Sequence, residues 1–557
     1  MRQWMKRSLL IIIVGISLYC GFLIYRVYTQ YNNDSSEIYD EDTWVNPLNN
    51  TSITEKIEIY KDDEQKEVDK IYLTILDTDK EKYSSFEEFI NSSSDTKNNI
   101  KVYFQHGDSK ALKLFEEEPN ATIQLKGKVS NKSVQKSYKI KLYDKTGLWR
   151  NQNIINLNKD YNDYLRIRNK LSFDYYKIIP SITSFRTRFV RLYVKDKFSN
   201  SSNDEFIDYG LYTQIEQPNK LFLKNHGLDP NGHLYKAEDF KFFLNDQYIK
   251  DKKDIDYSKK EFERVLEIRG NNNHTKLIEM LQAVNDMNRD INEVIDIYFD
   301  KENYLTWIGT NILFDNYKTN NSNFLLYSPV NSSKWYFMPW DYDKAWGIDE
   351  DRASWEKGLA IYFDNKLHQR FFQKDGNIEA LNKKIEELSK IITKEQTKSF
   401  IDRYYNILLS NITKLPDIKY LPITIKELNH QLEKLPDVTS LNKNYYSTLI
   451  ENPMPFYLHE PKYVESKWVF DWDSSYDIQG DKVSYTFEIS RDKYFNDIYM
   501  VVNDISESEC EVSDLDRGVY YFRVRARDSK DNLQIGYDVY RDEFGEEFYG
   551  IRRFFVD

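Results

Sequence analysis

The order of hydrophobic patterns along this 557-residue chain constrains its fold more than any other feature. Strand-like segments fill the chain from about residue 70 to residue 217, and segments with apolar residues at helical spacing follow. The strand-like segments are 71–76, 100–105, 122–125, 138–142, 187–196 and 208–217, and the helical ones are 274–298, 304–314, 379–392 and 398–409. Strands that precede helices in this way predict an α+β domain with a β-rich lobe and a helical lobe.

The last hundred residues have a different pattern. Apolar and polar residues alternate over 483–490 and 519–529, and Trp468 lies near the start of this region. Short alternating strands separated by turns predict an all-β sandwich, and "GVYYFRVRARD" resembles the late Tyr-rich strand of a fibronectin type III module. The proline-containing segment 453–461 separates this module, 462–557, from an α+β domain over 66–452.

The N-terminus contains a run of 18 uncharged residues, 8–25, preceded by Arg2, Lys6 and Arg7 and followed by an acidic stretch. This run is long enough to cross a bilayer as a helix. The positive flank predicts that residues 1–7 are cytoplasmic and that a polar tether, 26–65, leads to an extracytoplasmic bulk. The alternative is a cleaved signal peptide and a secreted protein.

Composition argues against two classes of protein. The net charge of −12 argues against a general nucleic-acid-binding protein, which would carry a basic excess. The two cysteines, Cys20 and Cys510, lie at opposite ends of the chain, so the sequence predicts neither a disulfide framework nor a thiolate metal site.

One segment, "LFDNYKTNNSNFLLYSPVNSSKWYFMPWDYDKAWG" at 313–347, concentrates candidate ligands. Asp341 and Asp343 follow an apolar run that ends at Pro339, and Asn323 precedes the apolar piece 324–327. If the two apolar pieces pair as a hairpin, Asn323 and Asp341 meet at the same end. Carboxylate and amide oxygens suit magnesium. The spacing alone leaves open a surface turn with incidental acids.

Several motifs in this order resemble the CotH family of atypical, secreted or spore-coat protein kinases. They are "QKSYKIKLYD", "LRIRNKLSFD", "RFVRLYVKD", "YGLYTQIEQPNKLFLK", "GHLYKAEDF", "NILF…NFLLYSP" and "WYFMPWDYDKAWG", which lie between residues 135 and 347. The resemblance as a whole covers roughly residues 70–346 and the helices that follow. The resemblance implies a divergent two-lobe kinase-like fold that binds ATP with magnesium or manganese. It also implies phosphorylation of Ser or Thr on proteins of a cell surface or spore coat.

The resemblance assigns roles to residues of this chain. Asp341 corresponds to the metal-binding Asp, Asn323 to the second metal ligand, and Asp343 joins them as a candidate. Residues 126–127, Lys and Gly, correspond to the start of a phosphate-facing hairpin turn. The phosphate-facing lysine itself is Lys139 or Lys141, since strand alternation puts both on one face. Glu216 is the expected ion-pair partner of that lysine.

The sequence departs from the family at one position. The family has an Asp five residues before its metal-binding Asn, in the role of the catalytic Asp, but this chain has Lys318 there and its nearest acid is Asp315. Three interpretations follow: an active kinase that uses Asp315, a weak kinase without a base, or a nucleotide-binding pseudokinase. A non-enzymatic role in surface or spore-coat assembly is the remaining alternative.

Overall fold

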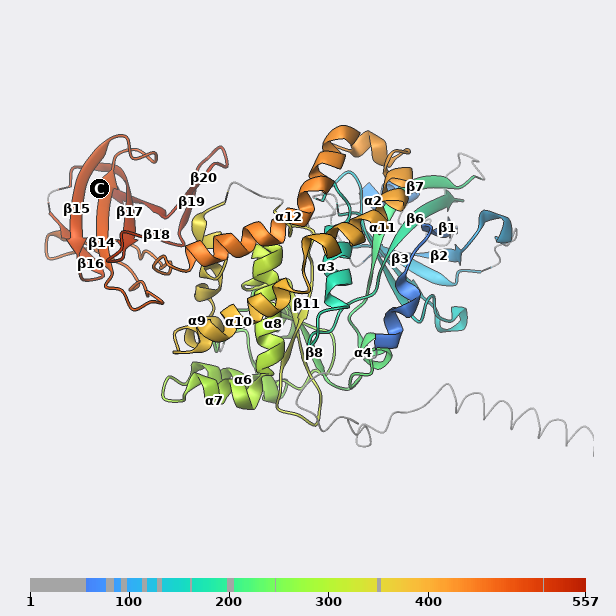
Figure 1. The fold of residues 1–557 in the computed structure, drawn as a ribbon, viewed down its shortest axis with the longest axis horizontal. Coiled ribbons are helices and arrows are strands. Elements are labelled where there is room, and N and C mark those ends of the chain that lie inside the picture. The colour runs from blue at the N-terminus through green and yellow to red at the C-terminus, as the bar shows by residue number, and fades with distance from the viewer. Residues whose placement is uncertain are drawn as a thin grey trace, which may run out of the picture. The chain divides into compact units, whose positions relative to one another are not determined.

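A closed barrel of seven strands forms the first part of the computed structural model (Figure 1). Its order is β1-β2-β3-β4-β5-β7-β6, and the parallel pairing of β1 with β6 closes it. The strands are β1 (Asp69–Ile75), β2 (Asn99–His106), β3 (Ala121–Leu125), β4 (Tyr138–Leu142), β5 (Ile154–Asn158), β6 (Thr187–Asp196) and β7 (Ile207–Glu216).

The structure describes residues 57–76, 85–91, 98–112, 118–127, 133–160, 163–197, 205–245, 247–347, 352–513 and 515–557.

A four-stranded sheet and a group of helices follow the barrel. The sheet has the order β11-β10-β8-β9, with β8 (His233–Ala237), β9 (Leu266–Ile268), β10 (Phe324–Ser328) and β11 (Tyr336–Pro339). The α-helices are α2 (Phe86–Asn91), α3 (Arg168–Tyr176), α4 (Lys220–Asn225), α5 (Lys259–Phe262), α6 (Thr275–Asn285), α7 (Ile291–Tyr298), α8 (Lys301–Phe314), α9 (Lys366–Phe372), α10 (Asn377–Ser389), α11 (Lys394–Ile412) and α12 (Ile425–Leu449). The expected mixture of strands and helices is confirmed.

Capping residues explain where the central helices begin and end. The single helix expected over 274–298 is wrong, because Asp290 begins a new helix, α7, by accepting a hydrogen bond from the Asn292 amide at 2.8 Å. In the same way Asp300 accepts from the Asn303 amide and begins α8. Asp315 ends α8 in the left-handed region, with φ 55°.

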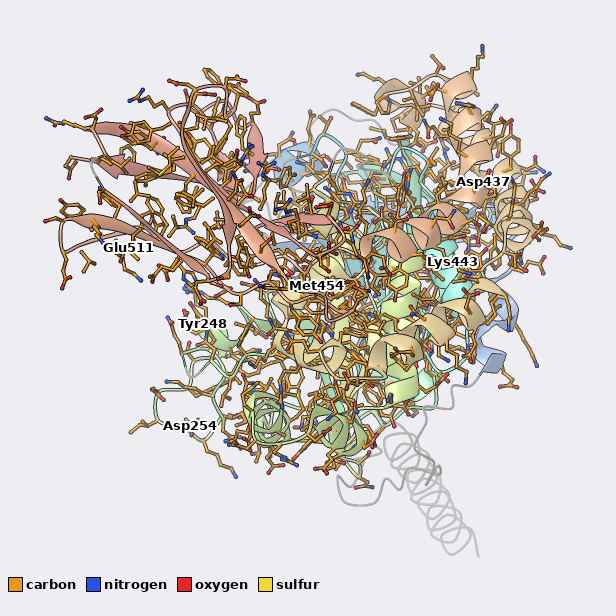
Figure 2. The ribbon with its side chains drawn as sticks, turned by 60° about the vertical axis from the view of Figure 1, so that its left-hand side comes forward. Tyr248, Asp254, Asp437, Lys443, Met454 and Glu511 are labelled. Carbon is orange, nitrogen blue, oxygen red and sulfur yellow. The ribbon has the colours of Figure 1, made fainter. Side chains whose placement is uncertain are left out.

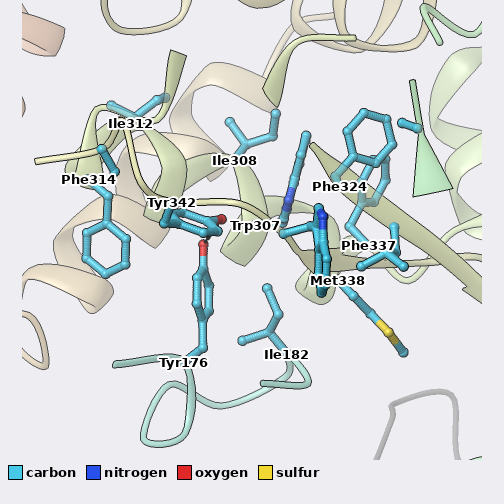
Figure 3. Packing of buried hydrophobic residues seen from close by; sticks show 14 of the residues in the cluster. Tyr176, Ile182, Trp307, Ile308, Ile312, Phe314, Phe324, Phe337, Met338 and Tyr342 are labelled. Carbon is cyan, nitrogen blue, oxygen red and sulfur yellow. Dashed lines mark hydrogen bonds between the residues drawn. The ribbon is translucent and has the colours of Figure 1, made fainter. Parts of the chain in front are cut away.

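The main core surrounds α8, which packs against α10, α12 and β11 (Figure 1). Almost every residue of α8 is buried, so this helix has no polar face. Figure 3 shows Trp307 of α8 beside Phe337 of β11, and their rings stack with centroids 4.5 Å apart. The buried helix is therefore a rigid base for the loops at its C-terminal end.

The C-terminal module consists of strands and has its own hydrophobic core. Met454 follows α12 and leads into the strands of this module (Figure 2). One sheet has the order β12-β13-β16, with β12 (Lys462–Val464), β13 (Lys467–Asp471) and β16 (Glu509–Val512). The other contains β14 (Ser484–Ser490), β15 (Ile498–Ile505), β17 (Gly518–Arg527), β18 (Leu533–Ile535) and β21 (Ile551–Val556), and β19 (Val539–Arg541) pairs with β20 (Glu547–Tyr549). Tyr520 donates its hydroxyl to the carbonyl of Asp516, four residues upstream, at 3.0 Å, as in the tyrosine corner of sandwich domains.

Within the residues that the structure describes, no helix is long and apolar enough to cross a membrane. The expected anchor at 8–25 lies outside the described residues, as do residues 1–7 and the tether up to residue 56.

Candidate active site

Strands β10 and β11 bring Asn323 and Asp341 to the same end of their sheet. They pair antiparallel with Phe324 opposite Pro339, so Asn323 precedes one strand and Asp341 follows the other by two residues. The predicted hairpin is confirmed. Both residues have left-handed backbones, with φ 57° and 59°. Non-glycine residues in this conformation are uncommon and cluster at functional sites.

Tyr342 fixes the loop between the two candidate acids (Figure 3). Its ring is buried, and its hydroxyl lies 2.6 Å from the hydroxyl of Tyr176 and donates to Asn311 Oδ1 at 2.7 Å. Its amide donates to Asn169 Oδ1 at 2.8 Å. Because the side chain between them is locked into the core, Asp341 and Asp343 have defined positions.

Two further acids join Asp341 and Asp343. Burial, followed by the charges of Asp341, Asp160 and Asp163, raises the pKa of Asp343 to about 9. Burial and the charges of Asp163 and Asp341 likewise raise the pKa of Asp160 to about 7. We call Asp341, Asp343, Asp160 and Asp163 the carboxylate cluster, because their charges oppose the ionisation of Asp343 and Asp160.

The loop between β5 and α3 supplies Asp160 and Asp163. Asp163 is fully buried, accepts from the backbone amides of Leu165 at 3.1 Å and Arg168 at 2.8 Å, and forms an ion pair with the Arg168 guanidinium. Asp160 has a left-handed backbone, with φ 43°. The Asp163 contacts fix the loop at the start of α3 and thereby hold Asp160 beside the β11 loop.

The types of donor present suit a magnesium ion. Magnesium prefers carboxylate oxygens and binds through one or two of them together with phosphate and water oxygens. Asn316 adds an amide at this point: its Nδ2 donates to the carbonyl of Asp341 at 3.2 Å, and its Oδ1 is buried without a hydrogen-bond partner in the described part of the chain. A cation here would relieve the mutual repulsion of the carboxylate cluster.

Lysine side chains lie beside the carboxylate cluster. Burial lowers the pKa of Lys126 to about 8, and the charges of Asp341 and Asp160 oppose this effect. Lys126 directly follows β3, donates to Asn158 Oδ1, and lies 5.8 Å from the ring centre of Trp340. Gly127 follows it with φ 81°, a backbone that glycine adopts without strain. Lys126 is thus the sequence-predicted lysine with a direct electrostatic link to Asp341.

The other cations near Lys126 come from three strands. Burial has the largest effect on the pKa of Lys126. The charges of Lys236 of β8 and of Arg269, which follows β9, lower this pKa further. Burial lowers the pKa of Lys139 of β4, and the charge of Arg269 lowers it further. Lys141, on the same face of β4 as Lys139, is exposed. Lys126, Lys139, Lys236 and Arg269 together form a basic group suited to phosphate.

The expected pairing of Glu216 with the lysine of β4 is wrong. Glu216 accepts from Arg186 Nε at 3.1 Å and lies 2.9 Å from His226 Nε2. The sheet register explains the difference: Glu216 is aligned through β5 with Ile140, whereas Lys139 is aligned with Ile215. Adjacent residues of a strand point to opposite faces, so Glu216 and Lys139 lie on opposite faces of the barrel wall.

Asp315 is mostly buried, whereas Lys318 is exposed. Asp315 forms an almost fully buried ion pair with Arg352. Lys318 lies on the short 3₁₀ helix η5 (Tyr317–Thr319), is exposed, and holds its ammonium 4.6 Å from the ring centre of Tyr317. Burial raises the pKa of Glu356, and the charge of Lys318 opposes this rise. A hydrogen bond from Arg541 lowers the pKa of Glu547 of β20, and the charge of Lys318 lowers it slightly further. Lys318 therefore lies near one acid of the C-terminal module, Glu547, and one acid of the short 3₁₀ helix η6 (Ser354–Glu356).

Sequence reasoning missed five residues of this site: Asp160, Asp163, Lys236, Arg269 and Asn316. Asp160 and Asp163 precede the motif "LRIRNKLSFD", and Lys236 lies inside "GHLYKAEDF", so the motifs marked their neighbourhoods without giving them roles. Arg269 follows β9 and Asn316 follows Asp315, outside the motifs. Their position at the site depends on tertiary contacts that sequence spacing does not encode.

Comparison with known proteins identifies the family. A family model described as CotH kinase protein matches residues 123–446, which is more than half of the chain. Inner spore coat protein H of Bacillus subtilis (strain 168) is 24% identical over 245 residues, which cover 43% of this chain and 62% of that protein. The chain therefore spans about three fifths of the length of that relative. The match includes most of the β3–β4 hairpin, the β10–β11 hairpin and the carboxylate cluster, and the chain belongs to the family of CotH kinase proteins.

Proposed function

We propose that this chain binds ATP with magnesium, or manganese, at the carboxylate cluster and transfers a phosphoryl group to Ser or Thr of proteins. One observation carries the proposal: Asp341 and Asp160 of the carboxylate cluster lie close enough to Lys126 for their charges to act on it, and Lys236 and Arg269 act on the same lysine. Phosphoryl transfer requires acidic side chains that bind a metal ion and basic side chains that bind the phosphates.

Each part of the site has a role in this proposal. Asp341 and Asn323 hold the metal, and Asp343 and Asp160 add charge near it. Lys126 and Lys139 contact the phosphates from the barrel side. Magnesium, when bound, supplies neutralisation of phosphate charge. The barrel and the helical part then act as the two lobes of a divergent kinase-like fold.

A second candidate function is nucleotide binding without efficient transfer. It is favoured by the ion pair of Asp315 with Arg352 and by Lys318 at the position where the family has its catalytic Asp. General-base assistance contributes about 10²–10⁴-fold, whereas positioning and charge neutralisation dominate phosphoryl transfer. The proposal therefore includes slow transfer with intact nucleotide binding.

Location and partners are also proposals. Residues 8–25 anchor the chain in a membrane with its bulk outside, and the alternative is secretion after cleavage of this segment. The relative is named as an inner spore coat protein, so surface or coat proteins are the proposed substrates. The net charge of −12 gives no support to a nucleic-acid partner. A non-enzymatic role in coat assembly remains the alternative if no nucleotide binds.

Transfer of labelled γ-phosphate tests the proposal. The full-length chain is incubated with magnesium and labelled ATP, alone and with a generic Ser/Thr-rich protein substrate, and incorporation is compared with that of Asp341→Asn. Slow incorporation that disappears in the variant supports the kinase. Nucleotide binding without incorporation supports the second candidate, and the absence of both contradicts the proposal.

A further inference from the structure

Two loops of the C-terminal module bring three carboxylates to one point. Asp477 and Asp481 lie in the loop before β14, and Asp528 directly follows β17. Each offers an oxygen, and these three oxygens lie within 4.8 Å of one another. Asp477 and Asp528 are buried, with exposed fractions of 5% and 4%. Three acids in such a small and mostly buried space repel one another strongly.

Asp477 provides an independent sign of a missing partner. Its Oδ1 accepts from the backbone amide of Asp481 at 2.9 Å, whereas its Oδ2 is buried and has no hydrogen-bond partner among the residues that the structure describes. A buried carboxylate oxygen without a partner is costly. Burial raises the pKa of Asp477, and the charges of Asp481 and Asp528 act in the same direction.

The surrounding contacts compensate only part of this charge. Lys530 lies 2.7 Å from Asp481, but its side chain is about half exposed, and one ammonium balances one of three negative charges. Ser529 also donates its hydroxyl to Asp481 Oδ1 at 2.8 Å. Asp528 is oriented by its own loop, since its Oδ1 accepts from the amides of Lys530 and Asn532, each at 2.8 Å, and its Oδ2 accepts from Asn532 Nδ2 at 2.7 Å. Carboxylate oxygens have further lone pairs, so these contacts do not prevent metal coordination.

We propose that these two loops bind a calcium ion through Asp477, Asp481 and Asp528. Calcium takes six to eight oxygens in irregular geometry and completes its shell with backbone carbonyls and water, which suits two loops better than the strict octahedron of magnesium. Lys530 moves into solvent when the ion binds. The site is distinct from the carboxylate cluster and does not depend on the proposed kinase function.

The same loops contact the end of α12. Gln479 donates to the carbonyl of Ile450 at 3.1 Å, and Asn532 donates to the carbonyl of Glu451 at 3.3 Å. An ion that crosslinks the loops also stiffens these contacts. Calcium binding therefore stabilises the junction between α12 and the C-terminal module, and its signature is a rise in thermal stability.

Thermal unfolding and calorimetry of the full-length chain test the proposal, with calcium chloride, magnesium chloride or a chelator as the added reagent. In the Asp341→Asn variant, in which the carboxylate cluster is weakened, we expect calcium to raise the unfolding temperature saturably and magnesium to do so much less. Asp477→Asn should lower calcium affinity more than about tenfold, in the range found for perturbed metal sites. Lys530→Ala should raise the affinity, because it removes the competing ammonium.

Two controls keep the test specific. Asp516→Asn changes an exposed acid of the same module and should leave calcium binding intact. Asp341→Asn should also leave it intact, so failure of the magnesium–ATP site and failure of this site are distinguishable. If Asp477→Asn does not fold, Asp481→Asn replaces it. A wild type without calcium binding, or binding that survives both substitutions, overturns the proposal.

Discussion

Arg352 forms an ion pair with Asp315, and the two side chains are only 5% and 11% exposed. The guanidinium also lies 4.3 Å from the ring centre of Tyr317. Asp315 ends α8 with φ 55°, so its carboxylate is held at a fixed point by both backbone and partner. An acid engaged in this way stabilises the loop, and it acts as a base only if Arg352 releases it.

Asp315→Asn should therefore destabilise the fold. Asn tolerates the left-handed backbone, so the substitution removes charge without adding strain. Removal of one partner of a buried ion pair typically costs about 3–5 kcal/mol, because the other charge stays buried. Urea unfolding measures the loss, and the double variant with Arg352→Gln should recover part of it. Unchanged stability combined with complete loss of phosphoryl transfer would instead make Asp315 the base.

Lys318→Asp should raise phosphoryl transfer. The gain should be at most about 10²–10⁴-fold, the usual contribution of a general base. Lys318 is exposed on η5, so the fold should tolerate the change. Rates of labelled phosphate transfer measure the effect, with ATP affinity as a control. If Lys318→Ala gives the same gain, removal of the cation, rather than a new base, explains it.

Magnesium affinity should rise with pH. The pKa of Asp343 is raised to about 9 in the absence of metal, so a proton competes with the cation below that pH. Calorimetric titration with magnesium between pH 6 and 9 should show this increase. Asp343→Asn should reduce it, leaving the part that comes from Asp160, whose pKa is raised to about 7. An affinity that is independent of pH in the wild type argues against Asp343 as part of the metal site.

His368 should make the protein sensitive to acid. Burial lowers the pKa of His368 from 6.5 to about 3, so the folded chain binds fewer protons than the unfolded chain between these values. This stability is fully present above pH 6.5 and is lost as pH falls toward 3, by about 1.4 kcal/mol per pH unit. Unfolding of wild type and His368→Gln at several pH values should show a shallower loss in the variant. Parallel curves for the two proteins would contradict this role.

The sequence predicted local elements better than their assembly. Alternation of apolar residues identified the β3–β4 hairpin, and the run before Pro339 identified β11, because both signals are local. Closure of the barrel depends on β1 pairing with β6, more than one hundred residues away, and no local pattern encodes it. The error over Glu216 has the same origin, since its position relative to Lys139 is set by the register of β4, β5 and β7.

The sequence likewise predicted some residues of the site and missed others. The positions of Asn323 and Asp341 at one strand end followed from hairpin geometry. Asp160 could not be predicted, because it reaches the site only through the loop between β5 and α3, which contacts of Asp163 hold in place. Such loop conformations depend on buried polar contacts that side-chain spacing alone does not specify.

Magnesium-dependent ATP binding by the wild type and by Asp341→Asn tests the central claim most directly. Asn suits the left-handed backbone of Asp341, so this substitution removes a metal-binding charge without a backbone penalty. Asp516→Asn serves as the matched control, an exposed acid far along the chain. Isothermal calorimetry should detect ATP binding with magnesium in the wild type and the control, and little or none in Asp341→Asn. Equal ATP affinity in all three proteins would contradict the assignment of the carboxylate cluster as the metal–nucleotide site.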